Sequence, residues 1–215
     1  MDVETYWSVI GAERRSLAEL LASLTDQQWA TPSLCAGWRV RDVAAHVALV
    51  PNAPGLLELI VGVGKVGGNP NRFNHDLAVR HADRPTAEIV AELRDHADSR
   101  KLSPPTTAPN LALDILVHGQ DIAIPLGLSR PMPLVPAGAA VTRVWGMGFP
   151  FWARRRFRGF RLTATDLDWS AGVGAEIRGP ISAQLLLLTG RLAALTMLDG
   201  DGADAIRARH RLPSP

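Results

Sequence analysis

Apolar residues recur with a helical period through the first 130 residues of the chain. Residues 3–24 show the pattern most clearly, with Glu13, Arg14 and Glu19 lying between the apolar positions Trp7, Ile10, Leu17, Leu20, Leu21 and Leu24. The same spacing predicts helices from about Val40, over residues 71–80, from an N-cap at Thr86, and over residues 109–126. Principal helices joined by short loops in this way indicate an antiparallel four-helix bundle.

The pattern changes beyond residue 130. The proline-rich residues 131–136 predict a linker, and a connecting helix is expected over residues 137–157. Alternation with a period of two over residues 160–165 predicts a strand, with residues 175–178 as its hairpin partner and a Leu-rich helix over residues 181–195. We therefore expect a mainly α protein divided into a helical bundle (1–130), a linker with a connecting helix (131–158) and a small α+β C-terminal domain (159–215).

Composition and charge narrow the class of protein. The chain is 47% hydrophobic and 20% charged, which is typical of soluble globular proteins. Its 23 basic and 21 acidic residues nearly balance, leaving a net charge of +2. The short basic run Arg154–Arg156 is interpreted as a solvated face, because nucleic-acid binding is typically marked by a longer basic stripe or a known module. No nucleic-acid partner is expected.

Cysteine content and hydropathy predict the compartment. Cys35 is the single cysteine, so an internal disulfide is impossible, which fits a reducing cytosol. The first residues, Met1–Glu4, are polar and acidic and lack the basic start and apolar stretch of a secretory signal. No run of about 18 apolar residues occurs. We expect a cytoplasmic protein without a membrane partner.

The candidate chemistry lies in two helical segments. Asp114 and His118 are four residues apart, so both side chains leave the same face of a helix. Aspartate and histidine both bind divalent metals, and His46 from another helix would complete a three-ligand site with an open position. Two metal-free alternatives stay open: an Asp114–His118 ion pair, and His46 as a hydrogen-bonded core residue. Asp121 is either an acceptor behind His118 or a surface carboxylate.

Three stretches of sequence carry a family resemblance. Residues 29–47, WATPSLCAGWRVRDVAAHV, resemble the N-terminal signature of the mycothiol-dependent maleylpyruvate isomerase family, within the DinB-like superfamily. Residues 114–123, DILVHGQDIA, are similar to its second signature. The tail, with LTATDLDW at 162–169, EIRGP at 176–180 and Gly190-Arg191, resembles the small C-terminal domain of this family. The resemblance covers nearly the whole chain.

The resemblance implies a fold, a cofactor and a reaction type. It implies a DinB-like four-helix bundle in which His46, Asp114 and His118 hold a divalent metal, usually zinc. Mycothiol, a low-molecular-weight thiol of actinobacteria, would be the cosubstrate, and a small-molecule electrophile the substrate. A thiol that enters the open metal position loses its proton and becomes the better nucleophile. The isomerase branch has Glu where this chain has Asp114, so the exact reaction stays open.

These implications predict a metal-dependent, mycothiol-using thiol transferase or cis–trans isomerase, acting as a monomer or a homodimer. Two alternatives remain: a non-catalytic small-molecule-binding or stress-response protein, and a metal hydrolase that uses bound hydroxide. Trp38 is a candidate for lining the pocket. Arg191 either binds a substrate or cofactor carboxylate or caps its helix. Cys35 is either a nucleophile or a small buried residue. The other histidines are expected at the surface: His75, His81, His96 and His210.

Overall fold

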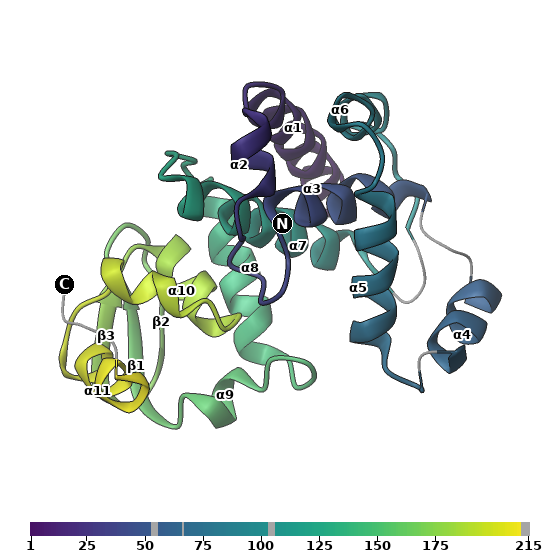
Figure 1. The fold of residues 1–215 in the computed structure, drawn as a ribbon. Coiled ribbons are helices and arrows are strands. Elements are labelled where there is room, and N and C mark those ends of the chain that lie inside the picture. Colours follow the sequence, from purple (N-terminus) through teal and green to yellow (C-terminus); the bar gives the residue numbers. More distant parts are fainter. Residues whose placement is uncertain (53–55, 66, 103–105, 212–215) are drawn as a thin grey trace. The chain divides into compact units, whose positions relative to one another are not determined.

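The structure is a computed structural model that describes residues 1–52, 56–65, 67–102 and 106–211. It divides the chain into two compact units, Met1–Arg130 and Pro131–Pro215. Both the mainly helical character and the small C-terminal sheet confirm the predicted fold class (Figure 1). No helix among the described residues is long and apolar enough to cross a membrane.

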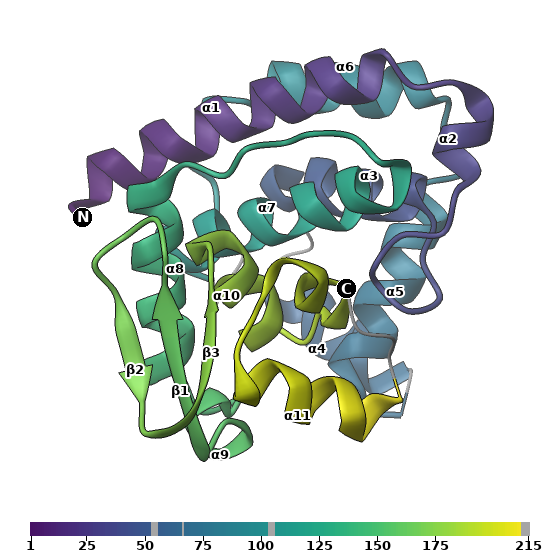
Figure 2. The ribbon, with the colours of Figure 1, turned by 90° about the vertical axis from the view of Figure 1, so that its left-hand side faces the viewer.

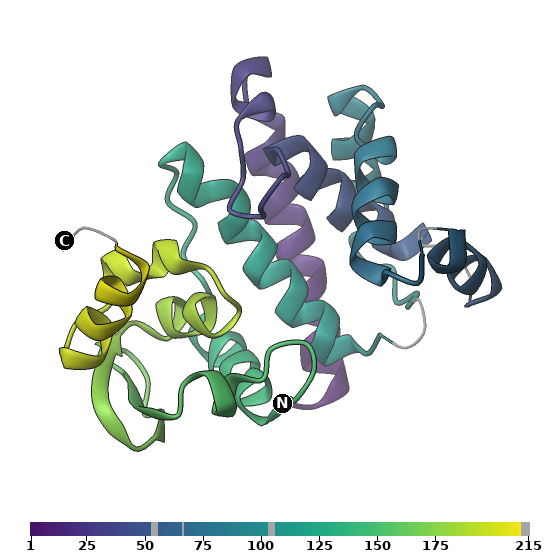
Figure 3. The same ribbon diagram turned by 60° about the horizontal axis from the view of Figure 1, so that its bottom comes forward.

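Four helices frame the N-terminal unit: α1 (Val3–Ala22), α3 (Val40–Leu49), α6 (Thr86–Asp95) and α7 (Ala108–Ala123). α1 and α3 each pack against both α6 and α7, and Figure 2 shows α1 beside α6. α5 packs on α3, and α4 lies next to α5 (Figure 3). The remaining elements of this unit have these bounds: α2 (Asp26–Ala30), the 3-10 turn η1 (Val50–Asn52), α4 (Leu56–Lys65), α5 (Pro70–His81) and the 3-10 turn η2 (Ile124–Leu126).

The core of this unit is formed by the apolar faces that the helical period predicted. Leu17 and Leu21 of α1, Ile89 of α6 and Ile115 of α7 are all fully buried in one cluster. α6 begins one residue away from its expected cap, because Pro85 is the N-cap and Thr86 is the first helical residue. The buried face therefore follows from the sequence, whereas the helix boundary differs by one position.

Arg14 is a charged exception within the buried face of α1. Only 1% of this residue is exposed. Its Nη1 donates to the carbonyl oxygens of His96 at 3.0 Å, Ala97 at 3.3 Å and Ser99 at 2.8 Å, just beyond the end of α6. These carbonyl oxygens belong to the C-cap of α6 and the residues that follow it, and the Arg14 guanidinium supplies them with a charged donor. Arg14 thus joins α1 to the end of α6.

The C-terminal unit begins with residues that the sequence suggested as a linker and connecting helix. α8 (Leu134–Gly146) packs against α10 (Ile181–Leu188), so it is part of this unit's core. α10 is shorter than the predicted Leu-rich helix and is followed by the 3-10 helix η3 (Leu192–Met197). The other elements are α9 (Ala153–Arg156), β1 (Gly159–Ala164), β2 (Ser170–Gly172), β3 (Gly174–Gly179) and α11 (Asp201–His210), which packs on β3.

The sheet has the order β2-β1-β3, and its pairing corrects the predicted hairpin (Figure 2). The antiparallel partner of β1 is β2, whereas β3, which contains the expected partner residues 175–178, runs parallel to β1. The chain crosses the start of β1 between Gly172 and Gly174. A Cβ on Gly174, whose φ is +135°, would lie 1.9 Å from the carbonyl oxygen of Gly159. A glycine is therefore required at this crossing.

Candidate metal centre

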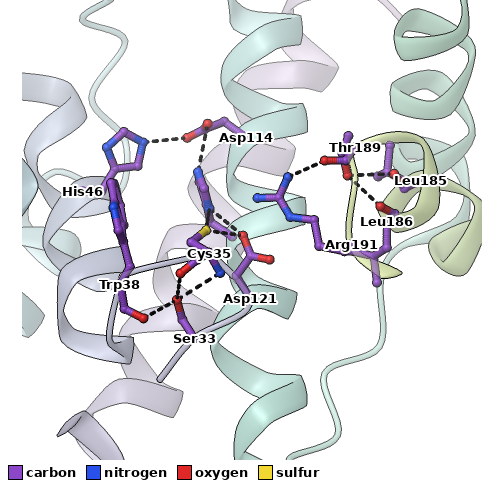
Figure 4. A network of polar contacts seen from close by, with 11 residues as sticks. Ser33, Cys35, Trp38, His46, Asp114, Asp121, Leu185, Leu186, Thr189 and Arg191 are labelled. Carbon is purple, nitrogen blue, oxygen red and sulfur yellow. Dashed lines mark hydrogen bonds and ion pairs between the residues drawn. The ribbon is translucent and has the colours of Figure 1, made fainter. Parts of the chain in front are cut away.

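The side chains of His46, Asp114 and His118 meet between α3 and α7. Asp114 and His118 lie one turn apart on α7, and α3 packs against this helix and supplies His46. Asp114 Oδ1 lies 3.3 Å from His118 Nε2. Its Oδ2 lies 3.7 Å from His46 Nε2, and Figure 4 shows Asp114 and His46 turned toward each other. The exposed fractions of the side chains are 13% for His118, 23% for His46 and 35% for Asp114. The cluster is therefore largely buried and opens to solvent at the carboxylate.

The donor atoms fit a small divalent cation. One ligand atom from each of the three residues lies within 4.8 Å of the other two. Zinc bonds of about 2.0–2.1 Å in tetrahedral geometry place neighbouring ligand atoms about 3.3 Å apart. Asp114 Oδ1 lies at this spacing from His118 Nε2, at 3.3 Å, and Asp114 Oδ2 lies slightly farther from His46 Nε2, at 3.7 Å. Two imidazole nitrogens and one carboxylate suit zinc and leave a fourth position for another ligand.

Asp121 holds the opposite edge of the His118 ring. Its Oδ2 lies 2.8 Å from His118 Nδ1, and its side chain is 0% exposed. A proton held on Nδ1 by a carboxylate leaves Nε2 as the nitrogen that can bind a metal. Of the two roles considered from the sequence, the structure places Asp121 as an acceptor behind His118 and not at the surface.

Both aromatic and thiol groups of the loop between α2 and α3 lie against the cluster. The Trp38 ring is 5.4 Å from the His46 ring in an edge-to-face arrangement and 5.9 Å from the His75 ring. Cys35 Sγ lies 3.1 Å from Asp121 Oδ2 and 3.7 Å from His118 Nδ1. Sequence reasoning considered Cys35 as a nucleophile or a small buried residue and missed this contact, which joins residues 86 positions apart.

The N-terminal part of the chain matches a known domain. Residues 10–101 match the model of the mycothiol maleylpyruvate isomerase N-terminal domain, a range that includes Cys35, Trp38 and His46. This match supports the resemblance to the mycothiol maleylpyruvate isomerase family over residues 10–101. Asp114 and His118 lie beyond the matched residues, so their placement beside His46 comes from the structure.

Solved structures and curated relatives extend the comparison. A crystal structure of the mycothiol-dependent maleylpyruvate isomerase matches with a TM-score of 0.64 and 13% identity over 94% of both chains. A mutant of that isomerase matches equally well, at 12% identity. At this identity the likeness establishes the fold. Two uncharacterized proteins from two strains of Mycobacterium tuberculosis are 31% identical over 146 residues. The match covers 56% of this chain and 56% of each relative, little more than half their length.

The two histidines of the cluster, His46 and His118, have opposite electrostatic surroundings. Burial lowers the pKa of His46 to about 4, against the attraction of Asp114 and with further lowering by the nearby His118. Burial also acts to lower the pKa of His118, but the charge and hydrogen bond of Asp114, together with the bonds to Asp121 and Cys35, raise it well above 6.5. Before a cation binds, His46 is therefore neutral at pH 7, whereas the two carboxylates beside His118 favour its protonated form.

The lowered pKa of His46 predicts acid sensitivity of the metal-free fold. The pKa of His46 is about 4 in the folded protein and about 6.5 in an unfolded chain, so the unfolded state binds more protons between these values. Stability therefore falls as the pH falls through this window. We expect His46→Gln to reduce this loss by up to roughly 3 kcal/mol. Urea unfolding of the chelator-treated unmodified protein and of His46→Gln, at neutral pH and near pH 4, measures this loss of stability in each.

His210→Gln serves as the matched control for this measurement, because His210 is an exposed histidine at the end of α11. Its pH profile should follow that of the unmodified protein, since both share every carboxylate that titrates in the same range. Parallel profiles for His46→Gln and the unmodified protein would contradict the assignment of a neutral, buried His46.

The sequence predicted two alternative roles for Arg191 and a surface position for His81. Arg191 Nη1 donates to the carbonyl oxygen of Thr189 at 2.8 Å, immediately after α10, so Arg191 contacts its helix end (Figure 4). The expectation that His81 lies at the surface is wrong. His81 Nε2 is 2.6 Å from Glu92 Oε2, and only 14% of its side chain is exposed. The buried Glu92 carboxylate requires partners, which His81 and Arg84 supply.

Proposed function

We propose that this protein is a metal-dependent thiol transferase or cis–trans isomerase that uses mycothiol as cosubstrate and acts on a small electrophile. One observation carries the proposal. His118 is held at Nδ1 by a wholly buried carboxylate while its Nε2 lies 3.3 Å from Asp114, and the ligand atoms of His46, Asp114 and His118 all lie within 4.8 Å of one another. The match of residues 10–101 to the mycothiol maleylpyruvate isomerase N-terminal domain supports the choice of mycothiol. The fold likeness to a mycothiol-dependent isomerase agrees with it.

Different residues would bind the cation, orient a ligand and shield the site. His46, Asp114 and His118 would hold the cation, and Asp121 keeps the Nδ1 proton on His118 so that Nε2 can coordinate. Trp38 covers one side of His46, and the exposed part of Asp114 marks the side from which small molecules can approach. When bound, a divalent cation supplies Lewis acidity that lowers the pKa of a thiol.

The identity of residue 114 is relevant to whether the reaction is S-transfer or cis–trans isomerisation. In S-transfer the thiol sulfur bonds to the electrophile and remains there, a leaving group such as the chloride of a chloronitrobenzene departs with its bonding electrons, and the thiol proton goes to solvent. In isomerisation the sulfur adds to a carbon–carbon double bond, the bond rotates, and the sulfur leaves again. The resemblance to the isomerase family implies Glu at this position, and aspartate is one methylene shorter. We therefore propose the thiol chemistry and include both outcomes, with Asp114 as the carboxylate ligand in each.

The test is turnover with and without metal and mycothiol. We expect zinc-loaded protein to consume mycothiol with an electrophile such as a chloronitrobenzene, or to isomerise a cis-configured unsaturated dicarboxylate. A strong chelator should abolish the activity and lower the melting temperature, because the cation stabilises only the folded state. Hydrolysis of an ester without thiol would instead indicate a metal hydrolase. A chelator-insensitive melting temperature without turnover would indicate a non-catalytic binding protein.

A further inference from the structure

The loop between α2 and α3 contacts both candidate imidazole ligands. Trp38 packs on the ring of His46, and Cys35 lies beside Asp121 (Figure 4). Cys35 Sγ also lies 3.7 Å from His118 Nδ1. We propose that Cys35 is a positioning residue of the metal site, which acts through Asp121 to fix the orientation of His118. This inference rests on the proposed function, because the site that it supports is the proposed metal site.

The loop has a defined backbone, so that Cys35 is held in place. Ser33 Oγ accepts a hydrogen bond from the Cys35 amide at 3.1 Å and donates one to the Trp38 carbonyl oxygen at 2.9 Å. The Trp38 amide in turn donates to the Cys35 carbonyl oxygen at 3.0 Å. Gly37 has a φ of +79°, which closes the turn without a Cβ in the left-handed region. These bonds couple the positions of Cys35 and Trp38 to one another.

The same loop holds Asp121 at two points. The Leu34 amide donates to the main-chain carbonyl oxygen of Asp121 at 3.2 Å. The Cys35 thiol donates to the Asp121 carboxylate, at 3.1 Å from Oδ2, and this same oxygen lies 2.8 Å from His118 Nδ1. Because the Asp121 side chain is wholly buried, water cannot replace a lost partner. Removing the thiol therefore loosens the carboxylate that orients His118.

The distances distinguish this role from metal ligation by Cys35. Cys35, His118 and Asp121 also form a group whose ligand atoms lie within 4.8 Å of one another. Their separations of 2.8 and 3.1 Å are those of hydrogen bonds. A zinc ion bound through bonds of about 2.0–2.3 Å would hold these atoms farther apart. His118 Nδ1 is also engaged by Asp121, so the thiol supports the site from behind.

Zinc affinity measured by competition with a chromogenic chelator tests the proposal. Outer-shell partners of metal ligands typically contribute about 10–100-fold in affinity, and a thiol is a weak donor, so we expect Cys35→Ala to weaken zinc binding by about tenfold. Cys35→Ser should restore part of the affinity, because its hydroxyl can still donate to Asp121. Leu34→Ala is the matched control, since it shortens the neighbouring side chain and keeps the backbone bond. It should bind zinc as the unmodified protein does.

A double-mutant cycle and cobalt spectra separate positioning from other roles. In an Asp121→Asn background, Cys35→Ala should have little further effect, because both changes act on the same contact. Cobalt-loaded protein should show no sulfur-to-cobalt charge-transfer absorption. Unchanged zinc affinity in Cys35→Ala overturns the proposal. A charge-transfer band that disappears in Cys35→Ala overturns it as well, since Cys35 would then be a ligand.

A metal-free readout separates this proposal from the proposed function. If the unmodified protein binds neither zinc nor cobalt, the proposed function fails. The imidazole nitrogen shifts of His118 in metal-free protein still report its tautomer and hydrogen bonding. Positioning by Cys35 predicts that Cys35→Ala changes these shifts and that Leu34→Ala does not. Unchanged shifts in Cys35→Ala would overturn positioning whether or not the site binds metal.

Discussion

Alanine in place of His46 is expected to remove tight zinc binding and, with it, mycothiol-dependent turnover. His46 is the single ligand candidate on α3, whereas Asp114 and His118 both lie on α7. Zinc sites in small proteins bind with about 10–16 kcal/mol, so one of three or four ligands accounts for roughly 3–4 kcal/mol. Its loss weakens zinc binding by roughly two to three orders of magnitude.

His75→Ala is the matched control for this experiment. The His75 ring contacts the same Trp38 at 5.9 Å, but it lies outside the candidate ligand set. Zinc titration against a competing chelator should therefore give an unchanged affinity for His75→Ala. Melting temperatures of both metal-free variants verify that they fold. Zinc affinity in His46→Ala equal to that of the unmodified protein would refute His46 as a ligand.

The proximity of the candidate ligands Asp114 and His118 on α7 could be predicted from the sequence because its geometry is local. Helical spacing alone places Asp114, His118 and Asp121 on neighbouring positions, and the structure has them in contact. The contact of His46 depends on the packing of α3 against α7, which the resemblance to a family suggested and periodicity could not. Cys35 could not be assigned, because its contact with Asp121 depends on the conformation of a loop.

The order and direction of the strands could not be predicted from the sequence either, because they also depend on tertiary packing. Alternation of apolar and polar residues predicts a strand but does not state which strand pairs with it, or in which direction. Residues 170–172 are too short to give an alternating pattern, yet they form β2, the antiparallel neighbour of β1. The deciding feature is the crossing near Gly159, where Gly172 and Gly174 pass close to backbone oxygens. That close approach is a property of the assembled sheet.

Arg14 shows where a helical pattern fails for a physical reason. The sequence places it among the charged positions between apolar residues of α1, yet the structure buries it. Burial lowers the pKa of Arg14, and Nη2 has no hydrogen-bond partner among the described residues. The cost of burying the Arg14 guanidinium is offset by hydrogen bonds to the carbonyl oxygens after α6, which lie more than 80 positions away in sequence. Only the packing of α1 on α6 brings them together.

Replacing Arg14 with alanine should therefore destabilise the N-terminal unit by roughly 3–5 kcal/mol, because it empties a buried volume and removes the charged donor from the carbonyl oxygens of His96, Ala97 and Ser99. Arg14→Met, which retains most of the packing, should lose less. The neighbouring Arg15 is the matched control: it pairs with Asp98 at the exposed surface, and such pairs contribute at most about 1 kcal/mol. Urea unfolding gives the three free energies. A cost for Arg14→Ala no greater than that for Arg15→Ala would show that the carbonyl contacts do not hold α1 to α6.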